Sequence, residues 1–155
     1  MNHMYEVAPL KGVGLILLGM SREASRSAMG VSPETFIKSS ASDFLTDTYN
    51  DFGFQVFFDA KDTVEYIELS AGRPIPVIYK GISVFETRAD DLIEIISLDA
   101  PYDENDPEFG YGYIFPMLEL SLWRPVIPES RNDEVGRYFS TIGIGIKGYY
   151  SNSAI

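Results

Sequence analysis

The stretch FQVFFDAKDTVEYIEL, residues 54–69, decides the fold class of this chain. Two runs rich in aromatic and β-branched residues, FQVFF and VEYIEL, flank the polar residues DAKDT, which have the length of a hairpin turn. Glu65 and Glu68 interrupt the apolar side chains of the second run, so one face of this segment is expected in water. We therefore predict an antiparallel β-hairpin over these residues.

Two short helices are predicted outside this hairpin. On its N-terminal side, Ser21 is a candidate N-cap for a helix over 22–29, and Gly30 is a candidate C-terminal stop. On its C-terminal side, apolar residues recur at i, i+3, i+4 and i+7 over 89–96. This spacing predicts an amphipathic helix, with Thr87 as its N-cap.

The remaining periodic segments predict one more helical turn and several strands. The segment SPETF, residues 32–36, has the serine and proline that open many helices. The apolar segment 13–18 predicts a buried strand or an extended segment, and 111–115 and 117–123 predict two strands separated by a proline. In the last strand, within 138–150, isoleucines alternate with glycines, so a backbone or a ring is expected to approach the glycine face closely.

These elements predict an α+β fold in which an antiparallel sheet carries two or three short helices packed on one side. The 155 residues have the length of a single domain, residues 1–155. The segments KGVGLILLGMSRE and KGISVFETRAD occupy similar places in the order of elements, roughly 70 residues apart. They suggest two half-repeats, 12–76 and 77–150, each a helix-plus-sheet unit.

The net charge of −11 is concentrated in the middle of the chain. Residues 43–119 hold 17 of the 23 carboxylates and only four of the 12 bases, whereas the two ends together are slightly positive. We expect these carboxylates to gather on one exposed flank. A chain this acidic repels phosphate backbones, so nucleic acid is not an expected partner.

The chain lacks the residues that many active sites require. Cysteine is absent, which excludes disulfides, thiolate metal sites and cysteine nucleophiles, and His3 is the single histidine. The glycines of GVGLILLG and GIGIKG do not match the spacing of nucleotide-binding loops. We expect no enzyme, cofactor or metal, although the many carboxylates leave acid–base catalysis open.

The longest apolar run, residues 12–20, is half the length that a membrane span needs. The residues before it carry one lysine, and no small-residue cleavage pattern follows it. We therefore expect neither a signal peptide nor a membrane contact, and we expect a cytoplasmic protein.

The acidic run between Asp99 and Glu108 has three interpretations. The residues DAPYDENDPEFG carry prolines and a late glycine where a calcium loop needs ligands and a central glycine, which leaves only a loose divalent site. A solvated connector is the second interpretation. The third is a partner surface, because nine acids and one base lie between Glu86 and Glu108. Clustered carboxylates speed the encounter with a cationic partner, and neighbouring tyrosines bury area on contact.

Four landmarks occur in order along the chain: GVGLILLGMSREASRSAMG, FGFQVFFDAKDTVEYIELSAG, VIYKGISVFETRADDLIEII and a final GYY. Together they resemble a group of small bacterial proteins that are found beside polymorphic or contact-dependent toxins and are thought to be their immunity proteins. The first landmark also looks like the opening of a helix-plus-sheet unit of small outer-membrane assembly lipoproteins and of a β-lactamase-inhibitory protein, which contains the unit twice. The lipoproteins need a lipid-bearing cysteine that this chain lacks, so their role is not carried over. No residue of known function transfers, because immunity surfaces vary with the toxin.

The charge distribution and the resemblance together predict a non-catalytic immunity protein that covers a basic toxin domain with an acidic face. The alternative is a small enzyme or ligand-binding module with a pocket beside the glycine-rich strands. The residues expected to contact the toxin domain are seven carboxylates and two tyrosines: Asp90, Asp91, Glu94, Asp103, Glu104, Asp106, Glu108, Tyr111 and Tyr113.

Overall fold

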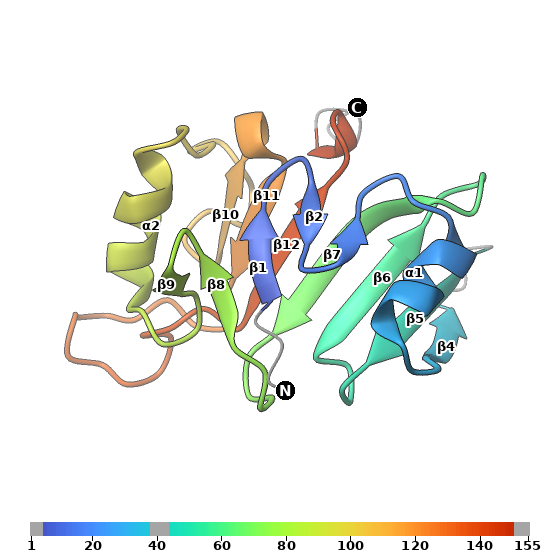
Figure 1. Cartoon of the computed structure of the whole chain (residues 1–155). Coiled ribbons are helices and arrows are strands. Elements are labelled where there is room, and N and C mark those ends of the chain that lie inside the picture. Colours follow the sequence, from blue (N-terminus) through green and yellow to red (C-terminus); the bar gives the residue numbers. More distant parts are fainter. Residues whose placement is uncertain (1–4, 38–43, 151–155) are drawn as a thin grey trace.

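A computed structural model describes residues 5–37 and 44–150 of the chain (Figure 1). The fold is α+β, with two α-helices, a mixed five-stranded sheet and an antiparallel seven-stranded sheet in the described residues. The predicted class and the antiparallel sheet are confirmed. The second, smaller sheet was not predicted.

The seven-stranded sheet has the strand order β10-β11-β12-β7-β6-β5-β4, and all neighbours are antiparallel. The predicted hairpin is confirmed as β6 and β7. Its strands are β4 (Glu34–Ile37), β5 (Leu45–Tyr49), β6 (Phe54–Phe58), β7 (Val64–Ser70), β10 (Gly112–Phe115), β11 (Leu120–Trp123) and β12 (Thr141–Gly145). Strands β7 and β12 pair with each other, so the four consecutive strands β4 to β7 meet the three consecutive strands β10 to β12 there. The half-repeat itself stays a prediction.

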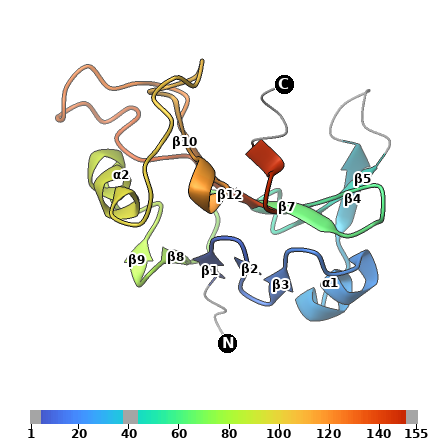
Figure 2. The same ribbon diagram turned by 90° about the horizontal axis from the view of Figure 1, so that it is seen from above.

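The five-stranded sheet lies over one face of the larger sheet, and Figure 2 shows the two layers edge-on. Its order is β3-β2-β1-β8-β9, with β1 and β8 parallel. Its strands are β1 (Tyr5–Ala8), β2 (Gly12–Val13), β3 (Ile16–Leu17), β8 (Val77–Tyr79) and β9 (Ile82–Ser83). The prediction of one buried strand or extended segment over 13–18 is wrong, because the chain reverses between β2 and β3 and leaves Leu15 and Leu17 exposed.

Helix α1 (Arg22–Met29) begins and ends as predicted. The Ser21 hydroxyl accepts a hydrogen bond from the Ala24 N–H at 3.1 Å, and Gly30 takes the left-handed conformation at φ 72° that ends many helices. The described residues form no helix with the length and apolar character that crossing a membrane would require.

Helix α2 (Ala89–Ser97) confirms the second predicted helix but corrects its N-cap. The Thr87 hydroxyl donates to the Ser83 carbonyl at 2.6 Å, and Thr87 lies one residue before the N-cap position. Arg88 stands at the N-cap position and makes no side-chain cap bond. The acidic residues of the first turn lie near the positive end of the helix dipole.

Two local predictions are wrong because strand pairing and a turn determine the structure there. The segment predicted as a helical turn over 32–36 instead contributes to β4, which pairs with β5 along four residues. Met117 does not start a strand, because Pro116–Leu118 forms a 3₁₀ turn (η1) and Glu119 takes a left-handed φ of 49°.

The hydrophobic core fills the space between the two sheets and helix α2. Fully buried side chains come from the small sheet (Ile16), from α2 (Leu92) and from the large sheet (Phe54, Ile67 and Ile144). Both helices lie on the covered side of the large sheet (Figure 2). This arrangement leaves α2 and two long connections at one end of the molecule.

Candidate protein-binding surface

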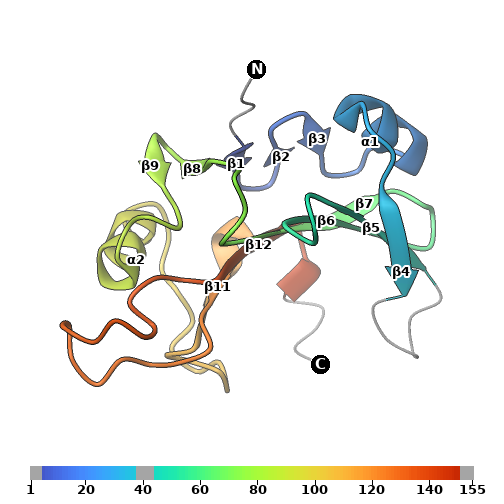
Figure 3. The ribbon, with the colours of Figure 1, turned by 90° about the horizontal axis from the view of Figure 1, so that it is seen from below.

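Three segments form what we call the acidic end: helix α2 and the connections 98–111 and 124–140. Figure 3 shows all three at the same end of the molecule, beyond the β10 edge of the large sheet. They contain eleven carboxylates and three arginines, a net charge of −8 out of −11 for the chain. Most of the excess negative charge of the chain therefore lies in these three segments.

The carboxylates predicted on α2 are exposed, and one arginine serves two of them. Arg131 pairs with Asp90 at 3.2 Å and with Asp91 at 3.4 Å, and both aspartates are about half exposed. Glu94 is exposed one turn further along the helix. Exposed pairs of this kind contribute only about 0–1 kcal/mol, so a cationic partner can displace Arg131 at small cost.

The carboxylates predicted in the connection 98–111 divide into two kinds. Asp103 accepts from the backbone N–H of Asn105 at 2.9 Å, and Asp106 accepts from that of Glu108 at 3.3 Å, so these two aspartates shape the turns of the loop. The Glu104 and Glu108 side chains are exposed. The loop is therefore ordered by two of its acids and presents the other two to solvent.

Asp99 is held by neighbours from the small sheet. The Lys80 ammonium lies 2.7 Å from its carboxylate, and the Tyr79 hydroxyl donates to the same group. These two hydrogen bonds hold the pKa of Asp99 below its ordinary range. Asp99 therefore fixes the start of the loop to β8.

Tyr113 packs beneath the acidic end through contacts between aromatic rings. Its half-buried ring contacts the rings of Tyr102 at 5.3 Å and Phe139 at 5.8 Å, while Tyr102 stacks on Phe109. Burial raises the pKa of the Tyr113 hydroxyl. Of the two predicted tyrosine anchors, only Tyr111 is exposed, at 45%.

Arg124 joins the two connections, a role that no pattern in the sequence indicates. The residue is only 4% exposed, and its guanidinium donates to the Gly110 carbonyl at 2.9 Å and to the Gly136 carbonyl at 3.0 Å. The same group lies 5.3 Å from the centre of the Phe139 ring. A buried cation thus fastens the connection 98–111 to the connection 124–140.

Large apolar side chains are exposed on the joined connections. Besides Tyr111, those on or next to the connections include Phe109, Trp123, Val126 and Ile127, each about 40% exposed, and Leu98, Val135 and Tyr138. A Cβ added at Gly110 would stand 2.7 Å from Ile127 Cδ1, so Ile127 lies directly over the backbone of the acidic loop. Exposed aromatic and aliphatic groups beside charged ones are typical of protein–protein interfaces.

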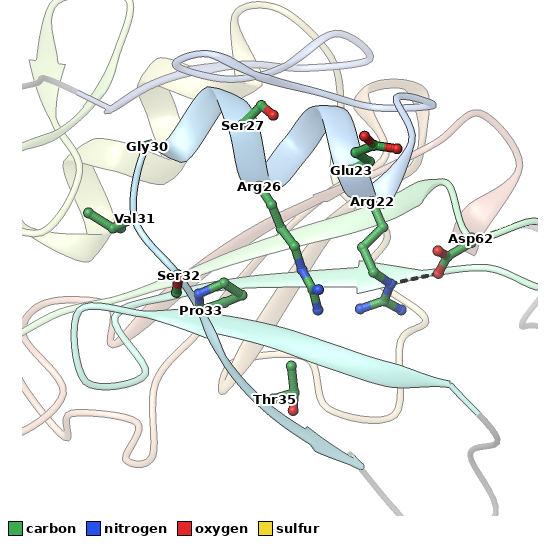
Figure 4. Close-up of a pocket in the computed structure, with 10 residues that line it drawn as sticks. All are labelled: Arg22, Glu23, Arg26, Ser27, Gly30, Val31, Ser32, Pro33, Thr35 and Asp62. Carbon is green, nitrogen blue, oxygen red and sulfur yellow. Dashed lines mark hydrogen bonds and ion pairs between the residues drawn. The ribbon is translucent and has the colours of Figure 1, made fainter.

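The central carboxylates do not all gather at this end, which corrects the expectation of one flank. Asp47 is fully buried beneath α1, where it accepts from Arg22 at 2.9 Å and from Arg26 at 2.8 Å. Asp62 pairs with Arg22 at 2.7 Å beside the same helix. Figure 4 shows both arginines extending from α1 toward the sheet.

A cavity of about 730 Å³ opens beside these two arginines and is lined by α1, the connection that follows it and Thr35 of β4 (Figure 4). The charges around it largely cancel, because Asp47 and Asp62 face Arg22 and Arg26. We assign no ligand to it.

The glycine face of β12 is occupied by rings, as the alternation of its residues predicted. A Cβ on Gly143 would overlap the Tyr66 hydroxyl, and one on Gly145 would stand 2.6 Å from Tyr149 Cγ. The Tyr150 hydroxyl donates to that of Tyr66 at 2.9 Å. The Tyr66 and Tyr149 side chains therefore fill the space directly beside these two glycines. A cavity of about 610 Å³ does lie beside the glycines of β2 and the turn that follows it.

No group of three or more His, Asp or Glu side chains in the described residues is placed to hold a metal ion. Comparison of the chain with protein-family models, with curated proteins and with solved structures finds no match.

Proposed function

We propose that this chain is a non-catalytic binding protein that docks a cationic protein domain on its acidic end. The observation that carries the proposal is the combination, on one surface, of exposed carboxylates with exposed aromatic and aliphatic groups. Glu94, Glu104 and Glu108 are exposed and form no ion pair with another described residue, and Tyr111 and Ile127 supply apolar area.

The partner that fits this surface is a basic toxin domain, which makes the chain an immunity protein. Clustered carboxylates accelerate association with a basic cleft, and the apolar groups contribute free energy once water is excluded. An interface of standard size, about 1,600 Å², is sufficient for nanomolar inhibition and requires no catalysis or cofactor. The proposal includes a cytoplasmic location, in keeping with a chain that has no cysteine.

The test is co-expression with the protein encoded by the adjacent upstream reading frame, followed by calorimetric measurement of the affinity of the two purified proteins. Wild-type chain is expected to bind that protein and to protect the cells that express it. The double variant Glu104→Lys, Glu108→Lys is expected to bind about ten- to a hundredfold more weakly at low salt, mainly through slower association. High salt is expected to reduce the difference in affinity between the wild type and the double variant, because it screens the exposed charges.

The matched control is Glu6→Lys, Glu23→Lys, which reverses two exposed carboxylates away from the acidic end and changes the net charge equally. It is expected to bind as the wild type does. Tyr111→Ala separately tests the apolar groups, with an expected loss of about 2 kcal/mol if Tyr111 is a central contact. Equal binding by the two double variants would show that the acidic end is not the docking surface.

A further inference from the structure

The two edge strands of the seven-stranded sheet, β10 and β4, differ in the backbone hydrogen bonds on their outer sides. At the β10 edge, the connection 98–111 folds back on the strand. The Asp103 N–H donates to the Ile114 carbonyl at 2.8 Å, and Phe109 forms an isolated β-bridge with Gly112. At the β4 edge, no described residue makes a backbone hydrogen bond to Glu34–Ile37 from the side opposite β5. Within 5–37 and 44–150, one edge is therefore covered by its own loop, and no backbone group pairs with the other.

An open edge strand presents backbone groups that are ready to pair. In an antiparallel pair, alternate residues direct their N–H and C=O groups away from the partner strand, so β4 offers such groups on its outer side. Edges that avoid pairing usually carry lysines, prolines or bulges within the strand. The four residues of β4, ETFI, contain none of these and only one charge.

Apolar side chains lie beside this edge on both faces of the sheet. Ile37, 55% exposed, is paired across the strands with Leu45, 44% exposed. On the opposite face the Phe36 ring lies 5.5 Å from that of Phe52, which is 43% exposed. A strand added at this edge would cover apolar groups above and below it.

We propose that β4 pairs antiparallel with β4 of a second copy of this chain, which joins the two large sheets into one. A twofold pair requires that one residue face its own copy. Centred on Phe36, the pair sets Phe36 against Phe36 and Thr35 against Ile37, which are aromatic and β-branched cross-strand contacts. Glu34 then lies outside the paired residues, so the strand does not oppose like charges.

The charge distribution fits a second copy better than an unrelated acidic or basic strand. Near the edge, Arg22 and Arg26 are offset by Asp47 and Asp62, so two copies meet through a nearly neutral region. The acidic end lies at the other edge, six strand spacings away, which is about 29 Å at about 4.8 Å per strand. This exceeds the Debye length of about 8 Å at physiological salt, so the two acidic ends are screened from each other. Both acidic ends also stay free for partners.

Sedimentation velocity of the full chain at about 0.15 M salt, from about 1 to about 300 µM, tests the proposal. We expect a concentration-dependent dimer, with hydrogen exchange of the 34–37 amides slowing as the dimer forms. Ile37→Lys places a cation against the partner strand and is expected to raise the dimer dissociation constant at least about tenfold. Circular dichroism and the binding assay for the upstream protein report whether the variant keeps its fold and its acidic end.

Met117→Lys is the matched control, because it adds the same charge at a residue that is 69% exposed near the opposite edge. It is expected to dimerise as the wild type does. A chain that stays monomeric throughout the range overturns the proposal, as does a dimer that Ile37→Lys and Met117→Lys affect equally. A monomer that instead captures an extended peptide at 34–37 would also overturn it, since the occupant would then be another protein.

Discussion

Gly143 is the position where one added methyl group is expected to have the largest effect on the outer face of the sheet. A Cβ at this residue would overlap the Tyr66 hydroxyl and stand 2.9 Å from Tyr66 Cε2. Gly143 does not have a positive φ, so the backbone itself accepts an L-residue. The cost of Gly143→Ala therefore comes from the Tyr66 ring alone.

The magnitude follows from the surroundings of that ring. Tyr66 is 7% exposed, stacks on Tyr149 with ring centres 4.6 Å apart, and bonds the hydroxyls of Ser121 at 3.0 Å and Tyr150 at 2.9 Å. Displacing it adds an overpacking cost of about 1–3 kcal/mol and loses two hydrogen bonds of about 1 kcal/mol each. The alanine recovers about 0.5–1 kcal/mol of backbone entropy. We expect a net loss of about 2–4 kcal/mol in the free energy of unfolding, obtained by combining these contributions.

The assay is urea unfolding of four proteins: wild type, Gly143→Ala, Tyr66→Ala and the double variant. In the Tyr66→Ala background the clash is absent, so Gly143→Ala is expected to be neutral or slightly stabilising. Gly112→Ala, in β10 of the same sheet, is the control, since its Cβ would meet no heavy atom closer than 3.6 Å, and it should change stability by less than about 0.5 kcal/mol. A Gly143→Ala cost that persists without the Tyr66 ring would refute the reasoning.

Two further predictions concern buried groups. Asp47→Ala leaves Arg22 and Arg26 without their shared carboxylate and is expected to lower the free energy of unfolding by about 3–5 kcal/mol, whereas Asp62→Ala, at an exposed residue, should cost about 0–1 kcal/mol. Urea midpoints for the two variants check this contrast, which equal losses would contradict. Burial raises the pKa values of Tyr66, Tyr149 and Tyr150 in the folded chain above the ordinary value of 10.0. As pH rises, these hydroxyls therefore lose their protons at a lower pH in the unfolded chain than in the folded chain. The contribution of these three hydroxyls to stability is expected to be constant below about pH 10 and to fall as pH rises beyond it, with a smaller fall in Tyr66→Phe; a flat profile from about pH 9 to about pH 11 would contradict the burial of these hydroxyls.

Local patterns in the sequence were sufficient to predict the helices and strands whose formation depends on residues close together in the chain. Helix α1 follows its cap serine and its terminal glycine, and the β6–β7 hairpin follows its alternation and turn. The small sheet depends on distant contacts: β1 pairs in parallel with β8 across some 70 residues. The secondary-structure propensities of single residues do not predict such pairing. A two-residue strand such as β2 is also too short to show a hydrophobic period.

The concentration of carboxylates can be counted along a sequence, but the contacts that support the candidate surface cannot be. Whether a carboxylate is exposed depends on cations that are distant in the chain, as Asp91 with Arg131 illustrates. One available signal was missed: Asp47 stands in a strand between Leu45 and Tyr49, on the face that a core would occupy. A carboxylate at such a position indicates a buried pair, and Arg22 and Arg26, one helical turn apart, were the available partners.

The contacts of Arg124 have a consequence for how the acidic end can change during evolution. The guanidinium bonds main-chain carbonyls, which every amino acid possesses, so the shape of the two loops does not depend on most of their side chains. Gly110 and Gly136 are constrained by their positive φ angles, whereas the residues at 104, 108, 111 and 127 are free to vary around a constant backbone. Individual side chains on this scaffold can therefore be exchanged without a change in the path of its backbone.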